Sequence, residues 1–231
     1  MSAQDMYYLR VAWKASRDQP DESVVYAVLV EFLFRHKNPP CRFILYPQMS
    51  LKWKPDVPQD PRQEITDIGL VLFTRNGYKL RCGVEAKRAT PVMAELPDAN
   101  HIIDNFEVQW AFRVAWYQAM DQAKAAFKND YCFDRKEPIR WILVVGPYWT
   151  PILLGPFSQA DLTVRSHKPS SSEDFIARVK IEVLLTQQPP ELEELYCFNS
   201  ASSYDRIEEI LKETDDAARP FINQMLSTNF N

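Results

Sequence analysis

Short apolar stretches alternate with polar and Pro-rich stretches along the chain, and their periodicity predicts alternating helices and strands. Segments rich in Ile, Leu, Val and Phe that are bounded by turn residues are predicted to be strands. Longer segments with apolar residues at helical spacing, such as Phe106, Trp110, Val114 and Tyr117, are predicted to be helices. In chain order, the pattern predicts a helix over 22–36, strands over 42–46, 65–73 and 79–86, a helix over about 104–128, strands over 139–145 and 151–155, and an amphipathic helix over about 204–226.

The order of these elements predicts an α/β fold in which helices flank a mixed central sheet. The continuous apolar run over 139–145 is typical of a buried central strand, and 151–155 is expected to pair with it. With 231 residues, the chain is long enough for one sizeable domain. We expect an N-terminal segment over 1–21, a core over 22–165, and a helical C-terminal extension over 166–231 that packs on the core.

Charged residues interrupt two of the predicted strands, although a buried charge is costly unless it is paired or binds a metal. Asp67 lies in the strand over 65–73, and Glu85 and Lys87 lie at the end of the next one, with Asn76-Gly77 as the turn between them. Because side chains alternate across a strand, Glu85 and Lys87 point the same way. If the hairpin places Asp67 near Glu85, two carboxylates and one ammonium group converge.

Alternation also predicts the surroundings of this group. Asp67 shares a face with Gly69, and Glu85 shares one with Arg81 and Gly83, so the two glycines are expected to leave open space beside the carboxylates. Carboxylates suit a hard divalent cation, which lowers the pKa of a bound water and stabilises charge on a phosphoryl oxygen. The opposite, apolar face of the second strand is expected to carry Leu80, Cys82, Val84 and Ala86.

Asp67 followed by Glu85-Ala-Lys87 on the next strand resembles the signature of the PD-(D/E)xK nuclease superfamily, which has the restriction-endonuclease-like fold. The resemblance covers roughly residues 22–157, including the order helix, three strands, helix, strand; Thr66 stands where the family pattern has proline. It implies that Asp67 and Glu85 bind one or two Mg²⁺ or Mn²⁺ ions. It also implies that Lys87 positions or activates the attacking water.

The resemblance implies further site residues on two helices. Many members add an acidic residue from the preceding helix, and Glu31 on the predicted helix 22–36 is the candidate for a third metal ligand. RecB-type relatives add a glutamine from the following helix. Gln118 and Gln122 are four residues apart and so lie on one helix face, and Gln118 is the preferred candidate.

Less specific interpretations of these residues remain open. The charged group could be a structural salt bridge on an exposed sheet face, or a degenerate site that keeps the fold without cleavage. A similar motif, Asp134-Arg-Lys136, falls in a polar stretch that predicts a solvated loop. The aromatic residues Trp110, Trp116 and Tyr117 are favoured as core residues over base-stacking platforms.

Charge argues against a protein that coats nucleic acid, because the net charge is −4. Residues 191–231 contain nine acids and three bases, so the negative charge is concentrated in the C-terminal part. The acidic helix there is most simply a solvated face, and a surface for a protein partner is the alternative. A modest set of basic residues near the candidate site is available for a phosphate backbone: Lys52, Lys54, Lys79, Arg81 and Arg88.

Several other classes are disfavoured. The five glycines form no phosphate-binding loop, and His36, His101 and His167 have no Cys or acidic partners at ligand spacing. There is no apolar run of membrane-spanning length and no secretory signal. The scattered cysteines predict reduced thiols in an intracellular protein of the cytoplasm or nucleus: Cys41, Cys82, Cys132 and Cys197.

We therefore expect a metal-dependent nuclease that hydrolyses phosphodiester bonds of nucleic acid, with DNA favoured over RNA. The alternative is a catalytically inactive binding or scaffold domain built on the same fold. Binding of Mn²⁺ through Asp67 and Glu85 distinguishes the two, because a scaffold does not require either carboxylate.

Overall fold

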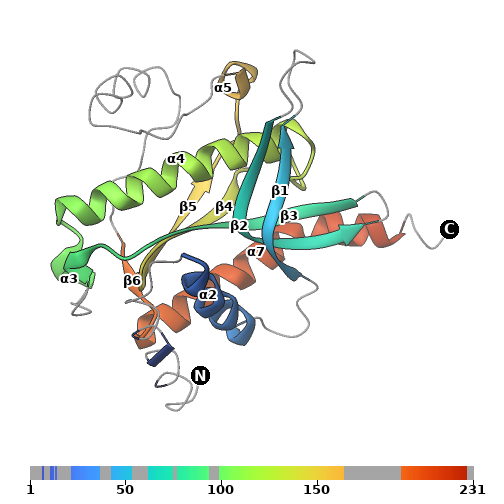
Figure 1. Ribbon diagram of the computed structural model, residues 1–231. Coiled ribbons are helices and arrows are strands. Elements are labelled where there is room, and N and C mark those ends of the chain that lie inside the picture. The colour runs from blue at the N-terminus through green and yellow to red at the C-terminus, as the bar shows by residue number, and fades with distance from the viewer. Residues whose placement is uncertain are drawn as a thin grey trace.

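Six strands form one mixed sheet in the order β1-β2-β3-β4-β5-β6 (Figure 1). The computed structural model describes residues 7, 11–12, 14, 22–36, 43–53, 62–74, 77–93, 99–163 and 194–227. β3 and β4 are parallel, and every other neighbouring pair is antiparallel. The strands are β1 (Ile44–Trp53), β2 (Arg62–Thr74), β3 (Gly77–Lys87), β4 (Ile139–Val145), β5 (Tyr148–Leu154) and β6 (Tyr196–Cys197).

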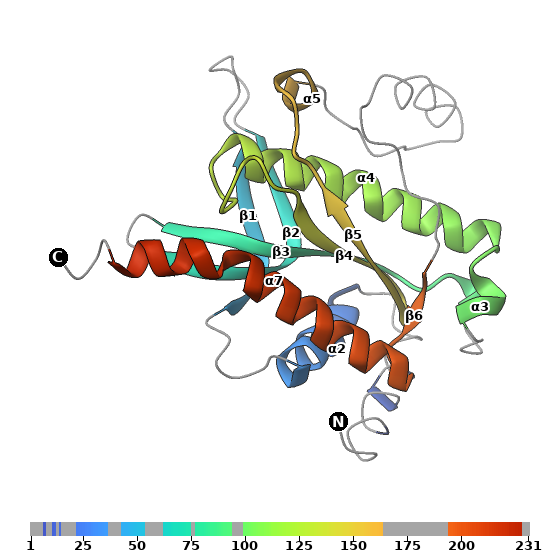
Figure 2. The same cartoon turned by 180° about the vertical axis from the view of Figure 1, so that it is seen from behind.

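The helices lie on both faces of this sheet. They are α2 (Glu22–His36), α3 (Ala99–Ile102), α4 (Phe106–Lys128), α5 (Gln159–Thr163) and α7 (Ala201–Ser227), together with a short 3-10 helix, η1 (Pro91–Met93). α4 covers one face, whereas α2 and α7 cover the other (Figures 1 and 2). The expectation of an α/β fold with a mixed sheet, flanking helices and a C-terminal helix is therefore confirmed. None of the described helices combines the length and apolar character needed to cross a membrane.

The parallel pair β3–β4 follows from the helix between these strands, because parallel neighbours need a long crossover connection. α4 provides it, and Asn105 caps its start by accepting hydrogen bonds from the backbone N–H groups of Glu107 and Val108. The central strand β4 is almost wholly buried, as its continuous apolar run predicted. The predicted pairing of residues 151–155 with this strand is also confirmed, since β5 pairs with β4.

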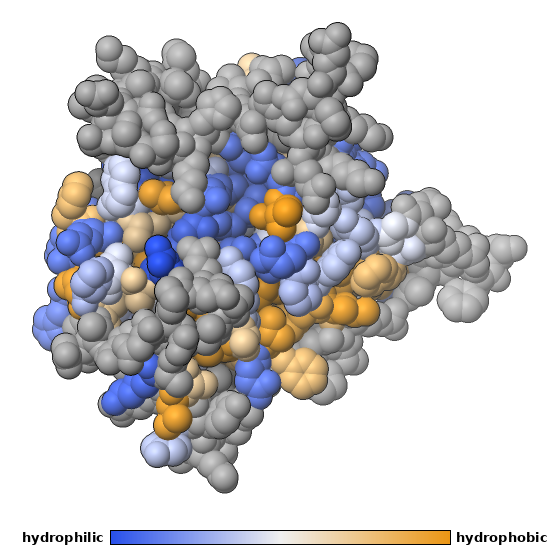
Figure 3. Space-filling model, viewed as in Figure 1, coloured by the Kyte–Doolittle hydropathy of each residue, from blue (hydrophilic) through white to orange (hydrophobic). Residues whose placement is uncertain are grey.

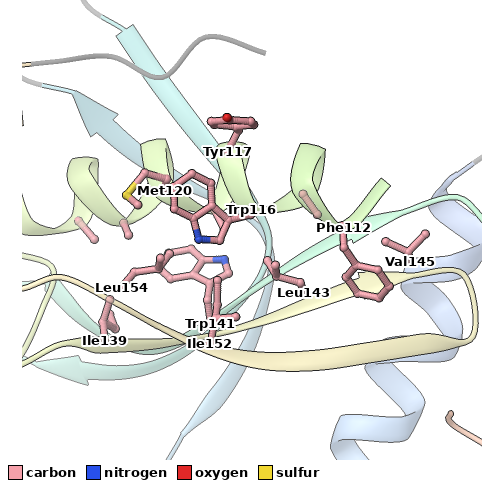
Figure 4. Packing of buried hydrophobic residues seen from close by; sticks show 14 of the residues in the cluster. Phe112, Trp116, Tyr117, Met120, Ile139, Trp141, Leu143, Val145, Ile152 and Leu154 are labelled. Carbon is pink, nitrogen blue, oxygen red and sulfur yellow. The ribbon is translucent and has the colours of Figure 1, made fainter. Parts of the chain in front are cut away.

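The core on the α4 side is built around two tryptophans. Trp116 of α4 and Trp141 of β4 are 2% and 0% exposed, and Phe112, Met120 and Leu143 pack near them (Figure 4). Trp116 and Tyr117 are thus core residues, as predicted. On the opposite side, Ile207, Ile210 and Leu211 of α7 pack in a cluster that also contains residues of α2 and of the sheet.

The structure corrects the predicted extent of the first strand. β1 continues beyond 42–46, through Pro47, to Trp53. Proline is tolerated there because β1 is an edge strand, where a missing backbone N–H removes no ladder hydrogen bond. Lys54, Cys41, His167 and the expected segments over 1–21 and 166–193 fall largely or wholly outside the described residues.

A β-bulge corrects the predicted faces of β3. Leu70 pairs with Cys82 and Val71 pairs with Leu80, so Arg81 is an extra residue in the ladder. Leu80 therefore faces the α4 side, whereas Cys82, Val84 and Ala86 face the α2 and α7 side. The expectation that Arg81 shares a face with Glu85 is therefore wrong. Its guanidinium lies between the rings of Phe43 and Phe133, 4.8 and 5.1 Å from their centroids.

Candidate functional site

Asp67 and Glu85 lie on neighbouring strands at the centre of the sheet. The adjacent pair Ile68–Val84 sets the register, which places the two carboxylates close together beneath α4. Asp67 is 7% exposed and Glu85 is 2% exposed. The hairpin therefore pairs in the way that the predicted convergence of these two acids required, and the pair is buried and does not lie on an exposed sheet face.

The Asp67 carboxylate is held by hydrogen bonds on both oxygens. The backbone N–H of Ala86 donates to Oδ2 at 2.7 Å, and the side-chain amide of Gln48 donates to Oδ1 at 3.5 Å. The neighbouring Thr66 hydroxyl donates to the carbonyl of Val84 at 3.0 Å, which joins the same two strands. These contacts fix Asp67 against the strand that carries Glu85.

Glu85 contacts one residue from its own strand and one from α4. Its Oε1 accepts from the ammonium group of Lys87, which also donates to the carbonyl of Ala86 at 2.9 Å. Its Oε2 accepts from the amide of Gln122 at 2.6 Å. The same amide nitrogen donates to the carbonyl of Ile65 at 2.8 Å, so Gln122 links α4 to both β2 and β3.

The pKa of Glu85 is raised to about 7. Burial is the main cause, because it disfavours the charged carboxylate, and the neighbouring Asp67 carboxylate acts in the same direction. The ammonium group of Lys87 and the hydrogen bonds from Lys87 and Gln122 oppose the shift. A strongly perturbed carboxyl group beside a second carboxylate is typical of a functional site.

Of the two candidate glutamines, Gln122 contacts the acidic pair directly. Gln118 lies one turn earlier on α4, and its Oε1 is buried, as is that of Gln122. Neither oxygen accepts a hydrogen bond from the residues that the structure describes. Two acceptor oxygens therefore lie on the α4 face that approaches the carboxylates, although the sequence favoured Gln118.

Glu31 has a different position. It lies on α2, which packs on the sheet face opposite α4, whereas Asp67 and Glu85 lie on the α4 side. Within the described part of the chain, no three His, Cys, Asp or Glu side chains gather into one group. Glu31 therefore does not join the acidic pair in this structure.

The glycines beside the site allow neighbouring side chains to pack closely against the backbone. The expectation that they leave open space is therefore wrong. A Cβ atom at Gly83 would lie 2.1 Å from the ring of Trp141, and one at Gly69 would lie 2.6 Å from the sulfur of Met49. Trp141 and Met49 thus fill the space that was expected to be empty. The sequence pattern could not reveal this because both contacts come from other strands.

The basic residues near the site are only partly available to an anionic ligand. Lys79 is paired with Asp130 at 3.0 Å, and Arg81 is buried on the opposite face. Arg88, directly after Lys87, is exposed. In the space-filling view, hydrophilic residues gather over the middle of the molecular face on which Figure 1 shows α4 and the first strands (Figure 3).

The donor set fits a divalent cation of the Mg²⁺ type. Asp67 and Glu85 supply two carboxylates, and Gln122 supplies a buried amide oxygen that accepts no hydrogen bond from the described residues. Mg²⁺ commonly binds proteins through one or two carboxylates and keeps several waters. Two acids without a third are therefore compatible with this ion.

No family model, curated protein or solved structure matches this chain.

Proposed function

We propose that this protein is a metal-dependent nuclease with a restriction-endonuclease-like fold, and that Asp67 and Glu85 bind its Mg²⁺ or Mn²⁺ ions. The observation that carries the proposal is the buried cluster of two carboxylates, one lysine and one glutamine. Burial raises the pKa of Glu85 to about 7, and the second carboxylate, Asp67, adds to this shift although the Lys87 ammonium opposes it. Two buried carboxylates beside a single ammonium group carry an excess of negative charge, which a bound divalent cation would offset.

Each residue of the cluster has a role in this proposal. The backbone N–H of Ala86 donates to Asp67 at 2.7 Å, and the side-chain amide of Gln122 donates to Glu85 at 2.6 Å, so both carboxylates are fixed in position. Lys87, on the Glu85 side, is placed to orient a water or to stabilise negative charge on the phosphate. A bound divalent cation would lower the pKa of water and stabilise charge on the phosphoryl oxygens. DNA is the favoured substrate, with RNA as the alternative.

A noncatalytic binding or scaffold domain is the second candidate. It is favoured by the shortage of available positive charge near the site. Lys79 is already paired with Asp130, and Arg81 is buried on the opposite face. An enzyme that holds a phosphate backbone needs exposed positive charge.

The test is cleavage of labelled single- and double-stranded DNA and RNA in Mg²⁺ or Mn²⁺, together with Mn²⁺ titration calorimetry. Wild type is compared with Lys87→Ala and with Lys136→Ala. Lys136 is a matched control because it belongs to the second acid-x-lysine motif, which forms an exposed turn. We expect cleavage by wild type and Lys136→Ala and none by Lys87→Ala. Absence of both cleavage and Mn²⁺ binding in wild type would overturn the nuclease proposal and support the noncatalytic scaffold domain.

A further inference from the structure

Gln48 has a backbone conformation that glycine favours. Its φ is +50°, within a strand whose other described residues have negative φ. A side chain in this region is strained, and such strain is found where the surrounding structure or the function requires it. A glutamine is kept at this position although glycine would fit the backbone better.

The unusual conformation turns β1 at the candidate site. Phe43 and Leu45 pack with the cluster on the α2 and α7 side, whereas Met49 and Leu51 are buried with the cluster on the α4 side. Odd-numbered residues therefore face one side of the sheet before Gln48 and the other side after it. In a regular strand they would all face the same side. The turn itself requires only the backbone, so it does not explain a glutamine side chain.

The side chain of Gln48 lies against Asp67. The flanking pairs Pro47–Ile68 and Met49–Thr66 place Gln48 directly across from Asp67 in the ladder. Its amide nitrogen lies 3.5 Å from Asp67 Oδ1, and the residue is exposed, whereas Asp67 is 7% exposed. Gln48 thus donates to one oxygen of a carboxylate whose other oxygen accepts the Ala86 N–H at 2.7 Å.

We propose that Gln48 is a positioning residue that orients the Asp67 carboxylate for a divalent cation, and that the strained backbone of β1 is retained for this purpose. The inference rests on the proposed metal site. Carboxylate oxygens accept more than one interaction, so Oδ1 can accept the amide N–H and still face a cation. Hydrogen bonds that orient metal-binding carboxylates are typically worth 10- to 100-fold in metal affinity or activity.

The experiment compares Mn²⁺ affinity by calorimetry with thermal unfolding in chelator for wild type, Gln48→Gly and Gln48→Met. Gln48→Gly removes both the amide and the strain, so we expect Mn²⁺ affinity to fall about 10-fold while the Tm rises by about 2 °C. Gln48→Met keeps the strain and the approximate volume but cannot donate a hydrogen bond. It should lose the same affinity with little change in Tm.

Asp130→Gly is the matched control, because Asp130 is the other described non-glycine residue with positive φ, at +62°. Asp130 pairs with Lys79 outside the site, and we expect a similar gain in Tm with unchanged Mn²⁺ affinity. Equal Mn²⁺ affinity in wild type and both Gln48 variants would overturn the inference while leaving the metal site intact. Absence of Mn²⁺ binding in wild type would instead overturn the proposed function.

Discussion

Each face of the sheet buries charge, but in opposite surroundings. On the α4 face, Glu85 is 2% exposed and lies beside a second carboxylate, whereas on the α2 and α7 face Arg81 is 7% exposed and lies between two aromatic rings. Arg81 has partners of complementary electrostatics, since an aromatic face attracts a cation. Glu85 is paired with the Lys87 ammonium but also has a neighbour of like charge, Asp67. A buried charge alone therefore does not single out a candidate site, and the second carboxylate beside Glu85 is what distinguishes the α4 face.

The largest expected difference between the two faces is in catalysis. Asp67→Asn removes one of the two proposed anionic metal ligands, but the amide oxygen can still accept the Ala86 N–H, so the fold should persist. We expect cleavage to fall by about a thousandfold, which corresponds to ~4 kcal/mol of transition-state stabilisation. Arg81→Met should cleave within about twofold of wild type. If both variants lost a comparable part of kcat/KM, the α4 face would not be the one that carries the proposed activity.

The second expected effect concerns the packing that holds the α4 face together. In Gly83→Ala, the new methyl group would lie 2.1 Å from the Trp141 ring, which is 0% exposed and cannot move aside. We expect a loss of about 3 kcal/mol in the free energy of unfolding, measured by urea denaturation. Gly69→Ala is the matched control, because its methyl group meets the flexible end of Met49 and should cost only about 1 kcal/mol.

The third effect is the pH dependence of stability in chelator. The pKa of Glu85 is raised from 4.5 to about 7 on folding, so the folded state binds more protons than the unfolded state between these values. With respect to this group, stability should therefore be highest below about pH 4.5 and should fall as pH rises through about 7, by about 3 kcal/mol in all.

The same effect can be isolated with Glu85→Gln, which cannot ionise. Subtraction of its unfolding free energy from that of wild type across pH 5 to 9 should yield this decline, with the variant the more stable protein at pH 8. A difference that does not vary with pH would show that Glu85 ionises normally in the folded protein. The guanidinium of Arg81 does not titrate in this range, so the opposite face should add no such dependence.

The smallest expected effect is on the opposite face. Arg81→Met replaces a cation stacked between Phe43 and Phe133 by an apolar chain of similar length. The lost cation–π attraction is partly offset by relief from burying a charge, so we expect destabilisation of only about 1 kcal/mol in urea denaturation. A loss above about 3 kcal/mol would indicate that Arg81 is an essential part of a buried polar network.

The sequence by itself determined the main elements and the hairpin that carries Asp67 and Glu85. Helix α2 has the predicted bounds 22–36, and β4 has the predicted bounds 139–145. The period of a strand and the short hairpin connection predicted that Asp67 and Glu85 lie on neighbouring strands of one hairpin. These features depend on contacts between residues near in sequence, so periodicity is sufficient to predict them.

The tertiary structure decided what surrounds the pair. Gln122, and not Gln118, donates a hydrogen bond to Glu85, a choice that depends on how α4 packs on the sheet. The bulge at Arg81 and the turn at Gln48 change which side chains share a face, and neither has a local signal in the sequence. These features come from packing between distant segments, where shape and burial select one arrangement among several that the local pattern allows.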